Sequence, residues 1–312
     1  MSQNLFYFLV LLKFTSKTKG FACEQPDVYD FLQRTNHSRN VTHKLNQPLK
    51  ILLHIIIITF LTVVTQIGGI IYLIAILLIK KSAEKKRLKR IGIFAVLYLL
   101  ATFLIVPNIA PIFGREKIKE TEFLKARSFF YKLANRNYVR PELNKSIGQI
   151  ATKFERLNAG IKMVYLDANF PFINKFPLLP HLSHNDGKKI DVSLIYENDN
   201  GQLTNKKPSV SGYGVYEMPT EKEYDQNAVC KKNGNWQYDF PKYLTLGTIN
   251  KDIEFSEKGT RQLAELILKQ KNIGKLFIEP HLKTRLNLNN GKVRFHGCQA
   301  VRHDDHIHFQ LK

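Results

Sequence analysis

The sequence is poor in cysteine and in acidic residues, and these shortages argue against several classes of protein. Three cysteines among 312 residues argue against a disulfide framework and a cysteine-rich zinc finger. The 26 acidic residues face 47 lysines and arginines, a formal net charge of +21, which favours anionic surfaces but also suits a generally basic proteome. The sequence also has no internal repeat, Gly-rich phosphate loop or dinucleotide fingerprint, so nothing in it indicates a nucleotide-binding enzyme.

Long uncharged runs are present instead. No charged residue occurs from Ile51 to Ile79, or from Ile91 to Val106. A membrane-spanning helix needs about 20 consecutive apolar residues, and the first run is too long and too apolar for an ordinary core helix. We therefore predict two transmembrane helices within residues 51–111, at about 51–79 and 91–108.

The segment between these runs fixes the predicted orientation. Residues 80–90 carry seven basic residues and one acid, and such a loop stays in the cytoplasm. Because membrane spans flank it, we do not read it as a nucleic-acid site. Residues 1–50 are then a poorly ordered external tail, and residues 112–312 are a domain on the periplasmic or extracellular side. The prediction is a multi-pass protein of the cytoplasmic (inner) membrane.

Periodicity in the C-terminal part predicts an α+β domain. Apolar spacing indicates helices over 115–135, 141–157 and 256–270, the last capped by Ser256. Strands are expected at 161–166, 276–278 and 293–295. Cys230 and Cys298 both fall in this domain, and the sequence leaves open whether they form a disulfide, because it does not give the distance between them.

Histidine is scarce, with 10 residues in the chain, yet five lie in two short stretches: His181 to Asp191, and His303 to His308. In a strand over 190–194, alternation places Asp191 opposite the apolar face. In a strand over 306–311, His306 and His308 project together from one face while their neighbours enter the core.

These residues form a candidate metal site. His184, Asp191 and His308 supply two imidazoles and one carboxylate, three protein ligands that leave a position open, as catalytic zinc requires. One Zn²⁺ per chain would activate water, and His306 and His303 are the candidates for proton transfer. Either Asp304 or Asp305 would orient an imidazole, while the other faces solvent. Asp and His ligands also permit other divalent metals.

The two stretches together resemble the penicillin-insensitive murein endopeptidases, which belong to the LAS group of zinc peptidases with the D-Ala-D-Ala metallopeptidases and the hedgehog fold. The group pairs a His-x6-Asp segment with a later His-x-His segment, and Phe277-Ile278-Glu279-Pro280 also looks similar to its penultimate strand. The resemblance covers roughly residues 140–312. It implies His184, Asp191 and His308 as ligands and His306 as the catalytic histidine, with His181 and His303 lining the site.

By this resemblance the fold would be hedgehog/DD-peptidase-like, with an antiparallel sheet. The activity would be hydrolysis of amide bonds in peptidoglycan cross-links or stem peptides. Two alternatives stay open: a D-Ala carboxypeptidase, and a non-catalytic zinc-containing domain for wall binding or signalling. The chain departs from the soluble, disulfide-rich members of the family by its membrane hairpin and by the polar insertion from Asn198 to Asn227.

Overall fold

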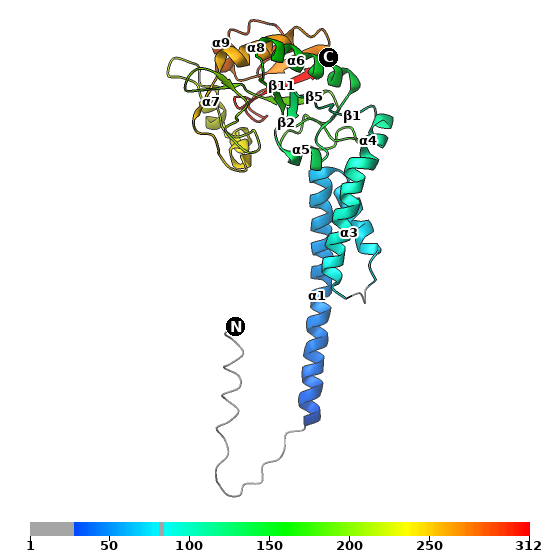
Figure 1. Cartoon of the computed structure of the whole chain (residues 1–312). Coiled ribbons are helices and arrows are strands. Elements are labelled where there is room, and N and C mark those ends of the chain that lie inside the picture. The colour runs from blue at the N-terminus through cyan, green and yellow to red at the C-terminus, as the bar shows by residue number, and fades with distance from the viewer. Residues whose placement is uncertain (1–27, 81–83) are drawn as a thin grey trace. The chain divides into compact units, whose positions relative to one another are not determined.

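Figure 1 shows a computed structural model of the chain, which describes residues 28–80 and 84–312. Contacts divide the chain into residues up to Ile55 and a larger unit, Ile56–Lys312. The first helix, α1, runs Val28–Thr65. The part of the predicted external tail at 1–27 therefore lies outside the described residues, whereas the part from Val28 onward is helical.

Among the residues that the structure describes, two helices are long and apolar enough to cross a membrane, Gln47–Thr65 and Lys86–Phe113. The prediction of one helix over 51–79 is wrong, because α1 ends at Thr65 and a separate helix, α2 (Gly68–Leu77), follows. The 10 residues of α2 rise only about 15 Å, roughly half the thickness of a bilayer's hydrocarbon core. The uncharged run is therefore a helix, a turn and a short second helix.

Local hydrogen bonding and two glycines explain this break. Gln66 adopts a φ of 67°, outside the helical range, and the Thr65 hydroxyl oxygen accepts a hydrogen bond from the Gly68 N–H at 2.8 Å. A Cβ atom on Gly69 would lie 2.6 Å from the carbonyl oxygen of Ile58, a distance that no side chain tolerates. Glycine thus lets α2 begin in close contact with the last turns of α1, so the chain reverses its direction there.

The second apolar segment is helical throughout but changes its winding. The α-helix α3 (Lys86–Leu100) passes into a π-helical turn, Ala101–Ile105, then α4 (Val106–Ile109) and a 3-10 turn, Ala110–Phe113. Pro107 lacks the N–H that an α-helix would bond to the carbonyl four residues earlier, and the π turn ends at Ile105, two residues before it. The predicted helix over 91–108 lies within this segment and is confirmed as helix.

The end of the apolar segment contacts the C-terminal domain. The Tyr98 hydroxyl donates a hydrogen bond to the Leu133 carbonyl at 2.7 Å, and the Phe172 N–H donates to the Gln66 side chain at 2.9 Å. The Phe103 and Phe129 rings stack with their centroids 5.9 Å apart. Side chains thus attach the helices to the domain, in addition to the peptide link.

The predicted helix over 115–135 is wrong. This stretch forms two short strands, β1 (Glu116–Lys117) and β2 (Leu124–Ala126), and a short helix, α5 (Phe129–Leu133). Ser128 caps α5 by accepting a hydrogen bond from the Phe130 N–H at 3.2 Å. The apolar residues of this stretch do not share one helix face, because Leu124 is fully buried while Phe129 is 57% exposed.

The domain is built on a six-stranded sheet of order β10-β9-β11-β5-β4-β2. Its central strands are antiparallel, whereas the outer pairs β10–β9 and β2–β4 are parallel, so the expected antiparallel sheet is mixed instead. The other strand bounds are β4 Met163–Tyr165, β5 Lys189–Ser193, β9 Ile273–Phe277, β10 Val293–Arg294 and β11 His306–Leu311. The expected strands at 161–166, 276–278 and 293–295 are confirmed, with ends that differ by up to three residues.

One face of this sheet carries the hydrophobic core. Helices α6 (Pro141–Leu157) and α8 (Glu257–Leu268) pack there, and both were predicted within two residues. Ser256 caps α8 as expected, accepting a hydrogen bond from the Gly259 N–H at 3.2 Å. The fold class is therefore α+β, as predicted. Burial of this face leaves the opposite face of β5 and β11 free to carry polar groups.

The remaining elements are small. Strand β3 pairs with β1, and β6, β7 and β8 form a three-stranded sheet. Their bounds, with those of the short helices, are β3 Tyr138–Val139, β6 Tyr196–Asn198, β7 Leu203–Thr204, β8 Ile253–Phe255, α7 Gln226–Lys232, the 3-10 helix η3 Trp236–Leu244 and α9 Pro280–Arg285. A disulfide joins Cys230, near the end of α7, to Cys298. This settles whether the two cysteines pair, which the sequence leaves open.

Candidate metal centre

Two adjacent strands bring the two halves of the predicted site together. In the register of β5 and β11, His308 lies opposite Asp191 and His306 lies opposite Ser193. Their neighbours Ile307 and Phe309 are fully buried in the core on the other face. Period-two alternation therefore places His306, His308 and Asp191 on the same face, as the sequence predicts.

His184 reaches this face from the loop before β5. The loop turns at Gly187, whose φ of 79° is unfavourable for residues with a Cβ atom. The His184 Nδ1–H donates a hydrogen bond to the Ala168 carbonyl at 2.7 Å. With the proton on Nδ1, the lone pair of His184 is on Nε2, which points toward Asp191 and His308.

The three predicted ligands converge on one point. His184 Nε2 lies 3.1 Å from Asp191 Oδ1 and 3.0 Å from His308 Nδ1, and His308 Nδ1 lies 2.9 Å from Asp191 Oδ1. Ligand atoms about 2.0–2.2 Å from a tetrahedral zinc ion stand about 3.3–3.6 Å apart, so a spread of a few tenths of an ångström brings these three atoms to the spacing of a single ion. The donor set fits a divalent metal because the buried Asp191 Oδ1 has no hydrogen-bond donor of its own.

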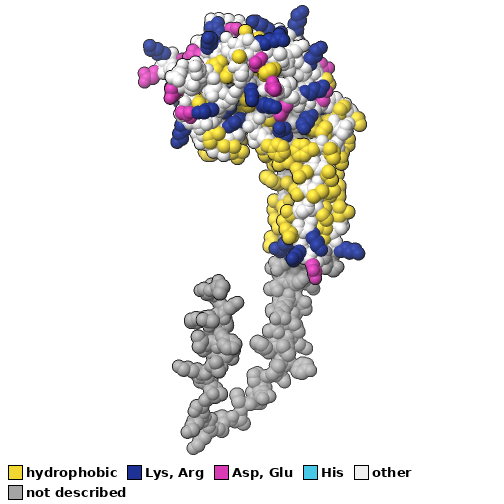
Figure 2. Space-filling view, viewed as in Figure 1, with side chains coloured by type: hydrophobic (Ala, Val, Ile, Leu, Met, Phe, Trp, Pro, Cys, Tyr) yellow, Lys and Arg dark blue, Asp and Glu magenta, His cyan; other side chains and the backbone are white. Residues whose placement is uncertain are grey.

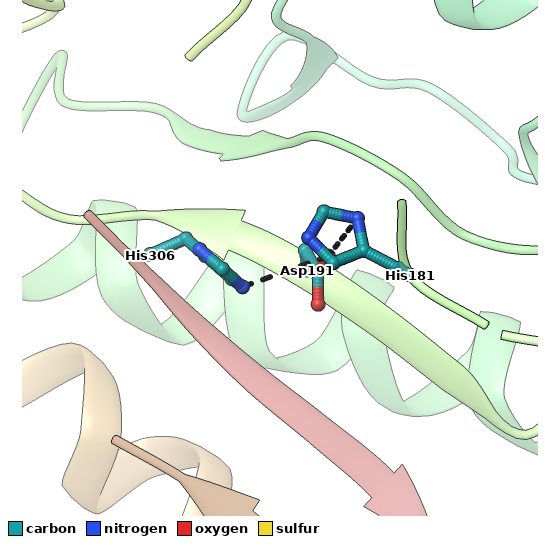
Figure 3. A group of neighbouring side chains, drawn as sticks. All are labelled: His181, Asp191 and His306. Carbon is teal, nitrogen blue, oxygen red and sulfur yellow. Dashed lines mark ion pairs between the residues drawn. The ribbon is translucent and has the colours of Figure 1, made fainter. Parts of the chain in front are cut away.

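A second group surrounds the other oxygen of the same carboxylate (Figure 3). His181 Nδ1 lies 3.5 Å and His306 Nε2 lies 3.7 Å from Asp191 Oδ2. This oxygen already accepts a hydrogen bond from the Tyr213 hydroxyl at 2.7 Å, and His181 Nδ1 also lies 3.2 Å from Asp167 Oδ2. His181 and His306 therefore line the site, while His184, Asp191 and His308 fit a metal more closely.

His306 belongs to a hydrogen-bonded pair. Its Nδ1 bonds to Asp305 Oδ1, and the other Asp305 oxygen accepts from the Gly214 N–H at 2.6 Å. Burial lowers the pKa of His306, but the carboxylates of Asp191 and Asp305 outweigh burial and raise the pKa to about 9. A carboxylate that fixes one imidazole nitrogen and leaves the other facing the site is the arrangement that general acid–base catalysis needs.

Burial keeps other imidazoles neutral. It lowers the pKa of His308 to about 3, and burial beside His306 lowers the pKa of His303 well below the ordinary value. Burial opposes the ionisation of Asp191, but the imidazoles of His184 and His306 hold the pKa of its carboxyl well below the usual range. At neutral pH the cluster thus offers an ionised carboxylate at Asp191 and a neutral imidazole at His308, the protonation states in which these two groups bind a metal.

Both aspartates before His306 are buried, so the expectation that one of them faces solvent is wrong. Asp305 orients His306, whereas Asp304 forms an ion pair with Arg302 and does not touch the histidines of the ligand set. A carboxylate at Asp304 can be buried because the Arg302 guanidinium, itself 1% exposed, neutralises it.

Several contributing residues are not evident from the sequence. Tyr213 bonds to Asp191, and Asp167 links His181 to the Arg136 guanidinium, whose Nε lies 2.7 Å from Asp167 Oδ1. The half-buried His296 lies beside the cluster, with its ring 5.9 Å from that of His308. Of these residues, only His296 could have been suspected from the sequence, because it follows an expected strand. The other contacts depend on how the loops fold.

The site is enclosed. His184, Asp191 and His306 are fully buried, and the segment carrying Tyr213 and Gly214 bonds to Asp191 and Asp305. A surface hollow of about 480 Å³ lies elsewhere, between Arg140 and the residues near Lys312. Solvent can therefore reach the candidate ligands only if a covering segment moves.

Comparisons with known proteins do not supply a function. No protein-family model matches the sequence, and a search of curated proteins likewise finds no match.

Proposed function

We propose that this chain is a membrane-anchored, metal-dependent peptidase that hydrolyses amide bonds in the peptide part of peptidoglycan. The observation that carries the proposal is that a cluster of three possible metal ligands lies next to His306, a histidine oriented by a carboxylate. Asp191 contacts both parts, through Oδ1 to His184 and His308 and through Oδ2 to His306. Two imidazoles and one carboxylate suit zinc with an open position for water.

The chemistry divides among these residues. A zinc ion held by His184, Asp191 and His308 would polarise the scissile carbonyl and lower the pKa of water. Its charge would also offset the Asp191 carboxylate, which would lower the pKa of His306. His306 Nε2 can then accept the proton of the attacking water and return it to the leaving amine, while Asp305 holds Nδ1.

His181 and His303 support this proton transfer. Nε2 of His181 is buried, has no hydrogen-bond partner and is free to contact substrate, while Nδ1 of the same ring lies beside Asp167. The His303 ring lies 4.8 Å from that of His306, and its backbone N–H donates to Glu279 Oε1 at 2.9 Å. Glu279 thus fixes the segment from which His303 reaches the site.

Location outside the cytoplasm supports a cell-wall substrate. The basic loop at 80–90 favours the cytoplasmic side, and Lys86–Phe113 is long enough to carry the chain across to the opposite side. The Cys230–Cys298 disulfide also fits an oxidising compartment. A periplasmic or extracellular domain would then face peptidoglycan, and the hedgehog/DD-peptidase fold remains part of this proposal.

The enclosure of the site favours one alternative, a non-catalytic zinc domain. A structural ion can be fully enclosed, whereas a catalytic one must meet its substrate. Product analysis separates the two functions. We expect the full-length protein to release new amine ends from cross-linked muropeptides, detected by mass spectrometry. A shortened stem peptide without cross-link cleavage would indicate the D-Ala carboxypeptidase, and bound zinc with no product would contradict hydrolysis.

Matched variants connect such activity to the site. His308→Ala and Asp191→Ala should lose both the metal, measured by elemental analysis, and the activity, whereas His306→Gln should keep the metal and lose at least about 100-fold in kcat. His281→Asn is the control, because the His281 ring bonds to the Glu217 carbonyl at 2.8 Å and lies outside the ligand set. Full activity in a metal-free His308→Ala protein would overturn the proposal.

A further inference from the structure

An exposed row of aromatic side chains lies on the C-terminal domain, far in sequence from the apolar helices. Trp236 is 76% exposed, Tyr243 is 72% exposed and Leu246 is 65% exposed. Phe240 links the two aromatic residues, with ring centroids 6.3 Å from Trp236 and 6.1 Å from Tyr243. We call Trp236, Phe240, Tyr243 and Leu246 the aromatic edge.

The aromatic edge is held firmly by the domain beneath it. Between the exposed side chains, Tyr238 is fully buried, and its hydroxyl donates a hydrogen bond to Glu279 Oε2 at 2.6 Å. The Tyr238 carbonyl accepts from the Arg302 N–H at 3.0 Å. Since this anchoring fixes the helix η3 and leaves its apolar side chains in solvent, the exposed area is a constant feature of the fold.

The charges around the aromatic edge are mainly positive. From Gln226 to Ile249 the sequence has three lysines, Lys231, Lys232 and Lys242, and one acid, Asp239. Asp239 is paired with Lys231, Lys242 and Arg302. The segment therefore presents an apolar row with a net positive charge beside it, which complements an anionic surface.

The position of the aromatic edge indicates what binds to it. In Figure 1 the η3 segment, drawn in yellow, lies at the end of the domain to which the apolar helices attach, at about the same level as α5. Figure 2 shows hydrophobic side chains there, and again where the helices meet the domain. Exposed apolar residues of the helical segment continue up to Ile112, which is 81% exposed, and to Phe129 on α5. A bilayer around the helices would thus extend toward η3.

We propose that the aromatic edge is a second membrane attachment, which inserts into the headgroup region of the bilayer that holds the helices. Trp and Tyr favour this interface, and lysines keep their ammonium groups in water while their stems lie along apolar surface. The aromatic edge joins the site through Tyr238, Glu279 and the His303 backbone. Attachment at two places would hold the metal centre at a fixed height and orientation above the membrane. The proposal rests on the membrane placement of the helices and not on hydrolysis.

The chain carries its own probe, because Trp236 is its single tryptophan. We would place the full-length protein in nanodiscs of phosphatidylethanolamine and phosphatidylglycerol, where both faces are accessible to solutes. Lipids carrying a nitroxide near the headgroup should quench Trp236 strongly, and aqueous iodide should quench it several-fold less than an exposed tryptophan. Failure of the protein to enter nanodiscs would contradict the membrane placement itself, and with it the basis of this proposal.

The control moves the probe within the same fold. In Trp236→Phe/Leu157→Trp the reporter is at the end of α6, where Leu157 is 60% exposed, and Figure 1 draws α6 on the part of the domain away from the helices. It should be quenched by iodide and not by the lipid nitroxide. Equal iodide quenching of Trp236 and this control would overturn the proposal. So would protection of Trp236 from both quenchers, which would indicate a protein partner instead.

Discussion

Tyr213 provides the sharpest test of the site, because its hydroxyl bonds to the carboxylate oxygen that does not face the metal ligands. The Tyr213–Asp191 hydrogen bond is 2.7 Å long, and both residues are almost completely buried. A hydrogen bond to a charged group contributes about 1.5–3 kcal/mol, and loss of such a support typically weakens metal binding about 10–100-fold. We therefore expect Tyr213→Phe to bind zinc about 10–100-fold less tightly, with the fold retained.

Tyr131→Phe is a matched control. Tyr131 packs in the same small cluster as Tyr213 and is equally buried at 3% exposed, but its hydroxyl donates to the Ser211 carbonyl, at 2.6 Å. It should lose about 1 kcal/mol of unfolding free energy with no change in metal affinity. Zinc affinity would be measured by competition with a chromophoric chelator, and stability by urea unfolding in EDTA. Equal zinc affinities for the two variants would refute the supporting role of Tyr213.

Two further predictions concern pH and topology. In the metal-free protein the pKa of His306 is raised to about 9, so the stability that its charge contributes is complete below about pH 6.5 and is lost as the pH rises through 9. Urea unfolding in EDTA should show a loss of at most about 3 kcal/mol over this window, and His306→Gln should remove that slope. The reversal at Gln66 turns α2 back along α1, so we expect positions 47 and 82 to lie on the same, cytoplasmic side of the membrane. Single cysteines placed at Gln47 and at Ser82 in a cysteine-free background should then react with impermeant maleimide only after the membrane is opened. Labelling of the Gln47 position from outside would contradict this topology and support the external tail predicted from the sequence.

The placement of the candidate metal ligands on one face could be predicted because strand alternation is a local rule. Ile190 and Val192 leave Asp191 on the opposite face, and Ile307 and Phe309 do the same for His306 and His308. The resemblance then paired the two segments. No local rule connects Tyr213 to Asp191 or Gly214 to Asp305, because these contacts arise only when a loop folds back over the sheet.

The wrong predictions have equally specific causes. Hydropathy does not reveal the turn at Gln66, because the residues on both sides of it are apolar. The turn is marked only by the hydrogen bond between Thr65 and Gly68 and by the close approach of Gly69 to α1. In the stretch 115–135, apolar residues at roughly helical spacing suggested a helix. Pairing of β2 with β4 and of β1 with β3 outweighs that spacing, so tertiary contacts decide the structure there.

The register of β5 with β11 also determines when the metal centre can exist. Asp191 and His308 are direct partners across two strands that are far apart in the sequence, and β11 lies between β5 and β9 inside the sheet. Until residues 306–311 have emerged and inserted there, neither the sheet nor the ligand set is complete. A chain still being threaded through a membrane would therefore hold no metal at this site, and the centre would assemble only in the compartment that receives the whole domain.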